Sequence, residues 1–157
     1  VEVPDPDKVA VLTQTTLSVD EAMRVMNVLK RRFPKLHTPR KEDICYATTN
    51  RQAAVKALRG KVDCWLVIGD KMSSNSNRLR ELGADSGVPA YLVLGAAEID
   101  AQWLRAVKTV GITSGASTPE SSVQAVVERL RQLGATSVEE VAGTTETIEF
   151  QLPLEVR

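Results

Sequence analysis

Apolar residues occur along the chain in two patterns, short continuous runs and helical spacing, which together predict alternating strands and helices. Runs rich in β-branched residues predict strands at Lys8–Thr13, Asp63–Ile68, Pro89–Leu94 and Lys108–Thr113. Spacings of three and four residues predict helices from Ser18 to Pro34 and at Ala47–Leu58, Ser73–Leu82, Ile99–Val107 and Pro119–Leu133. The alternation after Asp63 indicates an α/β fold, in which a mostly parallel sheet carries helices on both faces as three α/β/α layers.

The residues at the ends of these elements indicate where a helix begins and where the chain divides into parts. Ser18 and Glu21 form a capping box, in which the Ser18 hydroxyl accepts a hydrogen bond from the Glu21 amide. The polar connector Pro34–Glu42 separates the first strand–helix pair from the later ones and marks a candidate boundary. The tail, Ala135–Arg157, breaks the alternation, and within it Thr147–Leu152 alternates as an edge strand does.

Composition excludes several classes of protein. The 157 residues include 20 Lys plus Arg and 20 Asp plus Glu, so the net charge is zero and nothing attracts nucleic acid at long range. No apolar run approaches the roughly 20 residues that span a bilayer. Two cysteines cannot form the disulfide framework of a small secreted domain, so we expect a reducing cytoplasm. The absence of an initiator Met favours a piece of a longer protein.

Polar residues follow three of the predicted strands, where open α/β sheets bind their ligands. The junctions are Gln14–Thr16, Gly69–Arg78 and Ser114–Pro119, and each one carries hydroxyl or amide side chains. With backbone N–H groups at helix N-termini, they form a candidate anion site that needs no basic patch. The alternative for each junction is ordinary N-capping, as expected of Thr118 ahead of Pro119.

The two cysteines have different sequence surroundings. Cys45 directly precedes a helix, where the helix dipole stabilises a thiolate, so it is a candidate nucleophile or metal ligand. A small buried apolar residue is an equally good interpretation of Cys45. Cys64 lies inside an apolar strand and is expected to be an inert core residue. His37, the only histidine, lies in a polar loop and is expected to be solvated, and neither GxGxxG nor a Walker loop is present.

Four segments at these junctions resemble the 4-hydroxy-3-methylbut-2-enyl diphosphate reductases, which are LytB-type iron–sulfur enzymes. The likeness extends from Lys8 to Arg157. In chain order the segments are Gln14–Ser18 (QTTLS), Asp43–Gln52 (DICYATTNRQ), Ser73–Leu79 (SSNSNRL) and Gly115–Ser117 (GAS).

The resemblance implies a pseudo-threefold enzyme of three α/β units around a central cavity. Such enzymes hold a 4Fe-4S cluster through three cysteines and reductively remove the hydroxyl group of their substrate to give isopentenyl and dimethylallyl diphosphate. Cys45 matches one cluster cysteine, and Cys64 matches none, so this chain would supply one of the three ligands. The other two ligands would belong to a missing N-terminal half of the enzyme.

The resemblance also assigns substrate residues and partners. Thr15 matches a threonine that positions the substrate and relays protons, and four further residues match the diphosphate ligands, namely Ser73, Ser74, Asn75 and Ser117. An external electron donor such as ferredoxin or flavodoxin is implied. Residues 1–41 would be the end of the second unit, 42–134 the third unit, and 135–157 a tail that packs on the first. The alternative function is an isolated, non-catalytic diphosphate-binding fragment.

Overall fold

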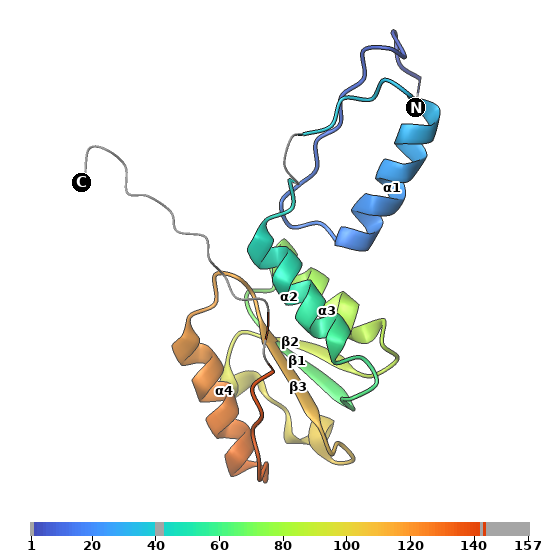
Figure 1. Cartoon of the computed structure of the whole chain (residues 1–157). Coiled ribbons are helices and arrows are strands. Elements are labelled where there is room, and N and C mark those ends of the chain that lie inside the picture. The colour runs from blue at the N-terminus through green and yellow to red at the C-terminus, as the bar shows by residue number, and fades with distance from the viewer. Residues whose placement is uncertain (1, 40–42, 142, 144–157) are drawn as a thin grey trace, which may run out of the picture.

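The computed structural model describes residues 2–39, 43–141 and 143 (Figure 1). Four α-helices and three strands make up most of the regular structure, and two short 3₁₀ helices lie between the second and third strands. In chain order the elements are α1 (Val19–Arg32), α2 (Tyr46–Ala57), β1 (Cys64–Ile68), α3 (Ser74–Ala84), β2 (Ala90–Val93), η1 (Ala96–Glu98), η2 (Ala101–Leu104), β3 (Val110–Ser114) and α4 (Glu120–Gln132).

The three strands form one parallel sheet in the order β2-β1-β3. Strand β1 lies in the centre, where Trp65 pairs with Ala90 on one side and with Gly111 on the other. All five residues of β1 are buried, as expected for a strand covered on both faces. The continuous apolar run therefore correctly predicted the central strand.

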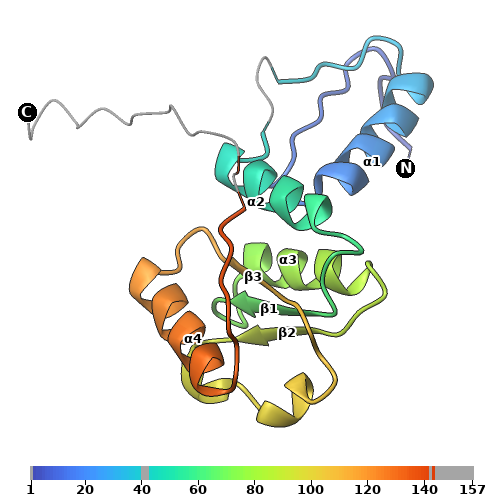
Figure 2. The ribbon, with the colours of Figure 1, turned by 60° about the horizontal axis from the view of Figure 1, so that its bottom comes forward.

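Alternate residues of β1 build two separate cores. Trp65 and Val67 pack with Val55 of α2 and Leu79 of α3 on one face of the sheet. Leu66 and Ile68 point to the other face and pack against residues of α4 and of the 3₁₀ region, among them Val126, Leu130 and Ile99. Figure 2 shows the resulting layers, with α2 and α3 on one side of the sheet and α4 on the other. The predicted α/β/α layering is confirmed.

The segment before α2 has far less buried structure. The strand predicted at Lys8–Thr13 is wrong, because its pairing is limited to an isolated parallel bridge between Ala10 and His37. Helix α1 begins at the predicted capping residue, where the Ser18 hydroxyl accepts from the Glu21 amide at 3.4 Å. None of the helix residues is buried, and Val25 and Val28 are exposed.

Two further expectations differ from the structure or lie outside it. The helix predicted at Ile99–Val107 is instead the short 3₁₀ helix η2, because Asp100 caps a single turn by accepting a hydrogen bond from the Gln102 amide. The edge strand predicted at Thr147–Leu152 falls outside the described residues. Across the described part of the chain, every helix is too short or too polar to span a bilayer.

Candidate functional site

The second and third predicted junctions lie at the carboxyl edge of the sheet, whereas Gln14–Thr16 follows a segment that is not part of it. After β1 the chain turns to α3 on one face of the sheet, and after the adjacent β3 it turns to α4 on the other face (Figure 2). Ligands of open α/β sheets bind where neighbouring connections diverge in this way. Two backbone bonds continue the sheet beyond the strand ends: the Gly69 amide donates to Val93 O at 2.9 Å, and the Gly115 amide donates to Ile68 O at 2.8 Å. Both loops therefore start from fixed positions.

Ser76 packs between the two loops. Its side chain is buried against Gly69 and Gly115, where a Cβ atom on either glycine would collide with the Ser76 hydroxyl. The Thr118 hydroxyl donates to Ile68 O at 2.9 Å and joins the second loop to the end of β1. Thr118 is therefore not the predicted cap of α4, because its hydroxyl is committed to the strand, and Pro119 occupies the N-cap position.

The N-terminus of α3 carries three of the predicted diphosphate residues. Ser73 is the N-cap, and its hydroxyl oxygen accepts from the Ser76 amide at 3.3 Å, which leaves its own hydrogen free to donate. Ser74 is exposed. Asn75 is only 6% exposed, and neither its amide nitrogen nor its amide oxygen has a hydrogen-bond partner in the structure. A buried side-chain amide without partners is costly, so Asn75 is suited to a ligand that satisfies it.

Ser117, the fourth predicted diphosphate residue, lies in the loop that follows β3. The Thr118 amide donates to Gly115 O at 3.0 Å, so Ser117 occupies a tight turn, and it is exposed. Asn77 ties the opposite loop, since its amide nitrogen donates to Lys71 O at 2.7 Å and to the carbonyl of Ser73 at 3.0 Å. Both loops are thus held by their own hydrogen bonds.

Thr15 and Cys45, predicted from separate segments, are neighbours. The Cys45 amide donates to Thr15 O at 3.1 Å, and Cys45 is the N-cap of α2 with no side-chain capping bond. The Cys45 thiol belongs to an exposed residue at the positive end of a helix dipole, which excludes the interpretation as a buried apolar residue. Cys64 is fully buried, as predicted, and burial, with a smaller contribution from the charge of Asp63, raises the pKa of its thiol.

A cleft of about 260 Å³ joins the Thr15 segment to the N-terminal half of α3. The Thr16 hydroxyl beside it is buried without a partner, and Arg78 forms ion pairs with Glu21 at 3.2 Å and Glu81 at 2.8 Å. The first and second junctions therefore line one cavity. The residues around it are Gln14, Thr16, Leu17, Met72, Ser74, Asn77, Arg78 and Glu81.

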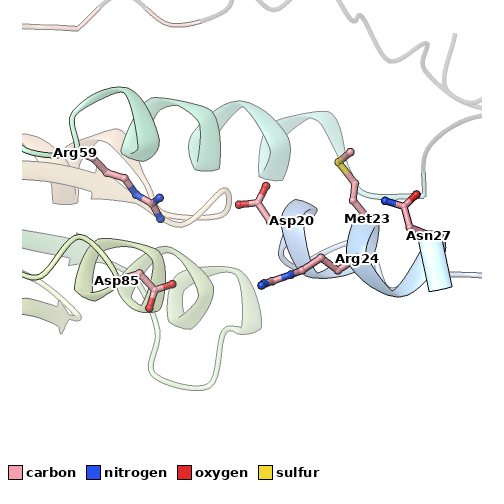
Figure 3. A pocket seen from close by; sticks show the side chains of 6 residues that line it. All are labelled: Asp20, Met23, Arg24, Asn27, Arg59 and Asp85. Atoms are coloured by element: carbon pink, nitrogen blue, oxygen red, sulfur yellow. The ribbon is translucent and has the colours of Figure 1, made fainter.

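A larger cleft of about 520 Å³ lies elsewhere and contains none of the predicted site residues. It is lined by α1, by the chain just beyond α2 and by the end of α3, whereas Cys45 lies at the opposite end of α2. Figure 3 shows its mostly charged and polar side chains, which are Asp20, Met23, Arg24, Asn27, Arg59 and Asp85. Its position separates it from the carboxyl edge of the sheet.

Two residues of α2 were not predicted to serve the site. The Gln52 side chain, 2% exposed, accepts from the Val19 amide and donates to Leu17 O. The Arg51 guanidinium donates to the Ser114 hydroxyl at 3.4 Å, at the end of β3. Their only signal in the sequence is their place in the segment that contains Cys45, since their partners are distant along the chain.

The described residues hold no group of three or more His, Cys, Asp and Glu that could bind a metal ion by itself. Cys45, exposed at a helix N-terminus, fits the requirements of one thiolate ligand to an iron–sulfur cluster. That this chain supplies one ligand of the cluster stays a prediction.

Known proteins resemble this chain over nearly all of its length. A 4-hydroxy-3-methylbut-2-enyl diphosphate reductase of Chromohalobacter salexigens is 53% identical over 156 residues, which are 99% of this chain and 49% of that relative. The reductase of the same name from Methylibium petroleiphilum is 53% identical over 149 residues, which are 95% of this chain and 45% of the relative. The chain thus spans about half the length of these curated relatives.

Two solved structures of diphosphate reductases are also similar to this chain. The E-1-hydroxy-2-methyl-but-2-enyl-4-diphosphate reductase of Plasmodium falciparum matches with a TM-score of 0.76 and 38% identity, over 82% of this chain and 40% of that one. A second solved structure, an (E)-4-hydroxy-3-methyl-but-2-enyl diphosphate reductase, has a TM-score of 0.55 and 32% identity over 79% of this chain and 43% of its own. The family model described as LytB protein matches residues 1–131. The chain therefore belongs to the LytB protein family.

Proposed function

We propose that this chain is part of a 4-hydroxy-3-methylbut-2-enyl diphosphate reductase. The reaction converts (E)-4-hydroxy-3-methylbut-2-enyl diphosphate to isopentenyl and dimethylallyl diphosphate, and this chain supplies the diphosphate site and one cysteine ligand of a 4Fe-4S cluster. The observation that carries the proposal is the buried amide of Asn75, which has no partner and lies at the N-terminus of α3. Family membership and the names of the relatives support the same reaction.

Neutral groups bind the diphosphate. The hydroxyls of Ser73, Ser74 and Ser117 and the amide nitrogen of Asn75 donate hydrogen bonds to its oxygens, and the N-terminus of α3 adds a favourable dipole. Their placement on the two loops at the end of β1 and β3 supports this assignment. The site holds the substrate by its anionic end and leaves the hydroxyl end to be directed toward Cys45 and Thr15.

Removal of the substrate hydroxyl breaks one C–O bond, consumes two electrons and two protons, and releases water. The cluster, when bound, supplies the electrons and a Lewis acid for that step. Cys45 would hold one iron through its thiolate, which the dipole of α2 stabilises. The Thr15 carbonyl accepts from the Cys45 amide, which supports a role for the Thr15 hydroxyl in orienting the substrate hydroxyl and passing a proton.

The complete enzyme needs partners beyond this chain. The remaining half of the longer protein provides the other two cluster cysteines, and an external donor such as ferredoxin or flavodoxin provides electrons in the cytoplasm. In that assembly residues 1–41 complete the second α/β unit, 42–134 form the third, and 135–157 pack on the first. The relatives, about twice as long as this chain, support a missing half.

Calorimetry with inorganic pyrophosphate tests the diphosphate site in the 157-residue chain. We expect binding to the unaltered chain and to Cys45→Ala, because the thiol is not a diphosphate ligand. The double variant Ser73→Ala/Asn75→Ala should lose binding, since two of the four donors are removed. A folded chain that shows no binding would count against a site formed in advance of the ligand.

A second candidate function is a diphosphate-binding fragment without redox chemistry. The exposure of Cys45 alone of the two cysteines favours it for the chain in isolation, since the resemblance implies three cluster ligands. Joining the chain to the rest of the longer protein distinguishes the two candidates. Substrate reduction by the joined protein supports the reductase, whereas pyrophosphate binding without reduction supports the fragment.

A further inference from the structure

One face of α2 is buried along its length although only part of it is apolar. Thr48, Gln52 and Val55 share this face, and each is at most 2% exposed. Val55 packs in the core between the sheet and the helices, whereas Gln52 faces the segment that leads into α1. The Gln52 side chain uses both amide atoms there: Oε1 accepts from the Val19 amide at 3.0 Å, and Nε2 donates to Leu17 O at 2.9 Å.

The same segment is attached to α2 a second time. The Cys45 amide, at the N-cap of α2, donates to Thr15 O at 3.1 Å. Gln52 lies seven residues further on, which is about 10 Å along the helix axis at 1.5 Å per residue. The chain from Thr15 to Val19 is thus hydrogen-bonded to α2 at two points, at Cys45 and, two turns further along the helix, at Gln52.

Other links between the first segment and the rest of the molecule are weaker or lie further from Thr15. The Lys56–Asp20 ion pair at 2.7 Å is partly exposed to solvent, and such pairs contribute little. Asp43 accepts from the Thr13 amide at 2.7 Å, which secures the chain on the other side of Thr15. Gln52 is the buried side chain that fixes the chain between Thr15 and α1.

We propose that Gln52 is a positioning residue that holds the Thr15 hydroxyl at its working distance from the Cys45 thiol, an inference that rests on the proposed function of these two residues. Without the Gln52 amide, the Val19 N–H and Leu17 C=O groups lose their partners in a partly buried place. The segment then shifts along α2 to reach water or other partners, and Thr15 moves with it. Misplacement of a reacting group by about 1 Å can cost on the order of 100-fold in rate.

Hydrogen exchange in the 157-residue chain tests the coupling without the cluster. Gln52→Met keeps the length of the side chain and removes both hydrogen bonds. The matched control is Lys56→Met, one turn later on the same helix, which removes the exposed link to α1. We expect Gln52→Met to speed exchange of the Cys45 amide by about tenfold or more, because its bond to Thr15 opens more often, while Lys56→Met leaves it nearly unchanged.

An unchanged Cys45 amide in a folded Gln52→Met chain would overturn the inference. Where Gln52→Met does not fold, Gln52→Glu decides at a pH at which its carboxyl is ionised, because it keeps the shape and the acceptor oxygen but places a carboxylate oxygen, which cannot donate, opposite Leu17 O. Its Cys45 amide must also exchange faster, and an unchanged rate again overturns the inference.

Kinetics of the longer enzyme that contains this chain give a second readout. Gln52→Met should lower kcat by about 10- to 100-fold with a much smaller change in KM, because Thr15 acts on the reacting end while the diphosphate loops are untouched. The iron and sulfide content should match that of the unaltered enzyme. Equal losses in Gln52→Met and Lys56→Met would overturn the inference, whereas an inactive unaltered enzyme would overturn the proposed function and leave the exchange result to stand.

Discussion

At the scale of single residues, the two cysteines differ in almost every physical respect. Cys45 is exposed at the N-terminus of α2, while Cys64 is fully buried in the central strand. Desolvation, and secondarily the negative charge of Asp63, disfavours the Cys64 thiolate and raises its pKa. Only the thiolate reacts with electrophiles or metals, so Cys45 is the cysteine of this chain that is suited to such reactions.

Alkylation of the folded chain should therefore be selective. With iodoacetamide near pH 8, we expect Cys45 to react and Cys64 to react more than about tenfold slower, because its thiol must first be exposed by unfolding. Peptide mass spectrometry over time measures both rates in the same sample. In urea the two rates should converge, and equal rates without urea would contradict the burial of Cys64.

The types of residue at the site could be predicted from the sequence, but their burial and their hydrogen-bond partners could not. Hydroxyl and amide side chains after strands predicted an anion site, and the structure places Ser73 and Asn75 at a helix N-terminus. The unpartnered amide of Asn75 depends on how α3 packs on the sheet, which no local pattern encodes. Gln52 escaped prediction because its partners, Val19 and Leu17, are 33 and 35 residues away along the chain.

At the scale of elements, similar apolar runs had different outcomes. Cys64–Ile68 pairs on both sides with parallel strands, whereas the Lys8–Thr13 run is limited to one bridge, between Ala10 and His37. A run of β-branched residues predicts a strand only where neighbouring strands are available to pair with it. The helix predicted at Ile99–Val107 is shorter in the structure for a local reason, because the 3₁₀ turn that Asp100 caps ends at Leu104.

The close fit of the two site loops makes Gly115 sensitive to any side chain. A Cβ atom there would lie 2.5 Å from the Ser76 hydroxyl oxygen, so Gly115→Ala must displace a buried side chain. We expect a loss of about 1–3 kcal/mol in the free energy of unfolding, as is typical of overpacking. Urea denaturation followed by circular dichroism measures it.

Two further variants separate this collision from a general cost of alanine. Gly95→Ala should be nearly neutral, because a Cβ atom at that position meets nothing within 4 Å. Ser76→Ala removes the colliding oxygen, so Gly115→Ala should cost about 1 kcal/mol less in that background than alone. Additive losses in the double variant would refute the close contact of Ser76 with Gly115.

At the scale of the molecule, the core belongs to the part that follows Asp43. Phe33 is the one buried residue among the described residues 2–39, and the two apolar clusters lie around the sheet. The segment that carries Thr15 is therefore held against α2 by hydrogen bonds from Gln52 and Cys45 rather than by apolar packing. The position of the segment to which we assign a catalytic role therefore depends on a few polar contacts.

The cluster is predicted to need more protein than this chain contains. The chain has two cysteines, of which only Cys45 is exposed, whereas the family resemblance implies three ligands. After anaerobic reconstitution with iron and sulfide, we expect the 157-residue chain to retain no stable four-iron cluster. A longer protein, which joins it to the residues that its relatives carry beyond this match, should retain about four iron and four sulfide per molecule.

Cys45→Ser in the longer protein provides the control for ligand identity. It should lower the retained iron and sulfide and change the electron paramagnetic resonance spectrum of the reduced cluster, because an alkoxide or water replaces the thiolate. Cys64→Ser, a change in the core, should leave the spectrum of any folded protein unchanged. A stable four-iron cluster in the 157-residue chain alone, or an unaltered spectrum in Cys45→Ser, would show that the ligands lie elsewhere and would refute the role assigned to Cys45.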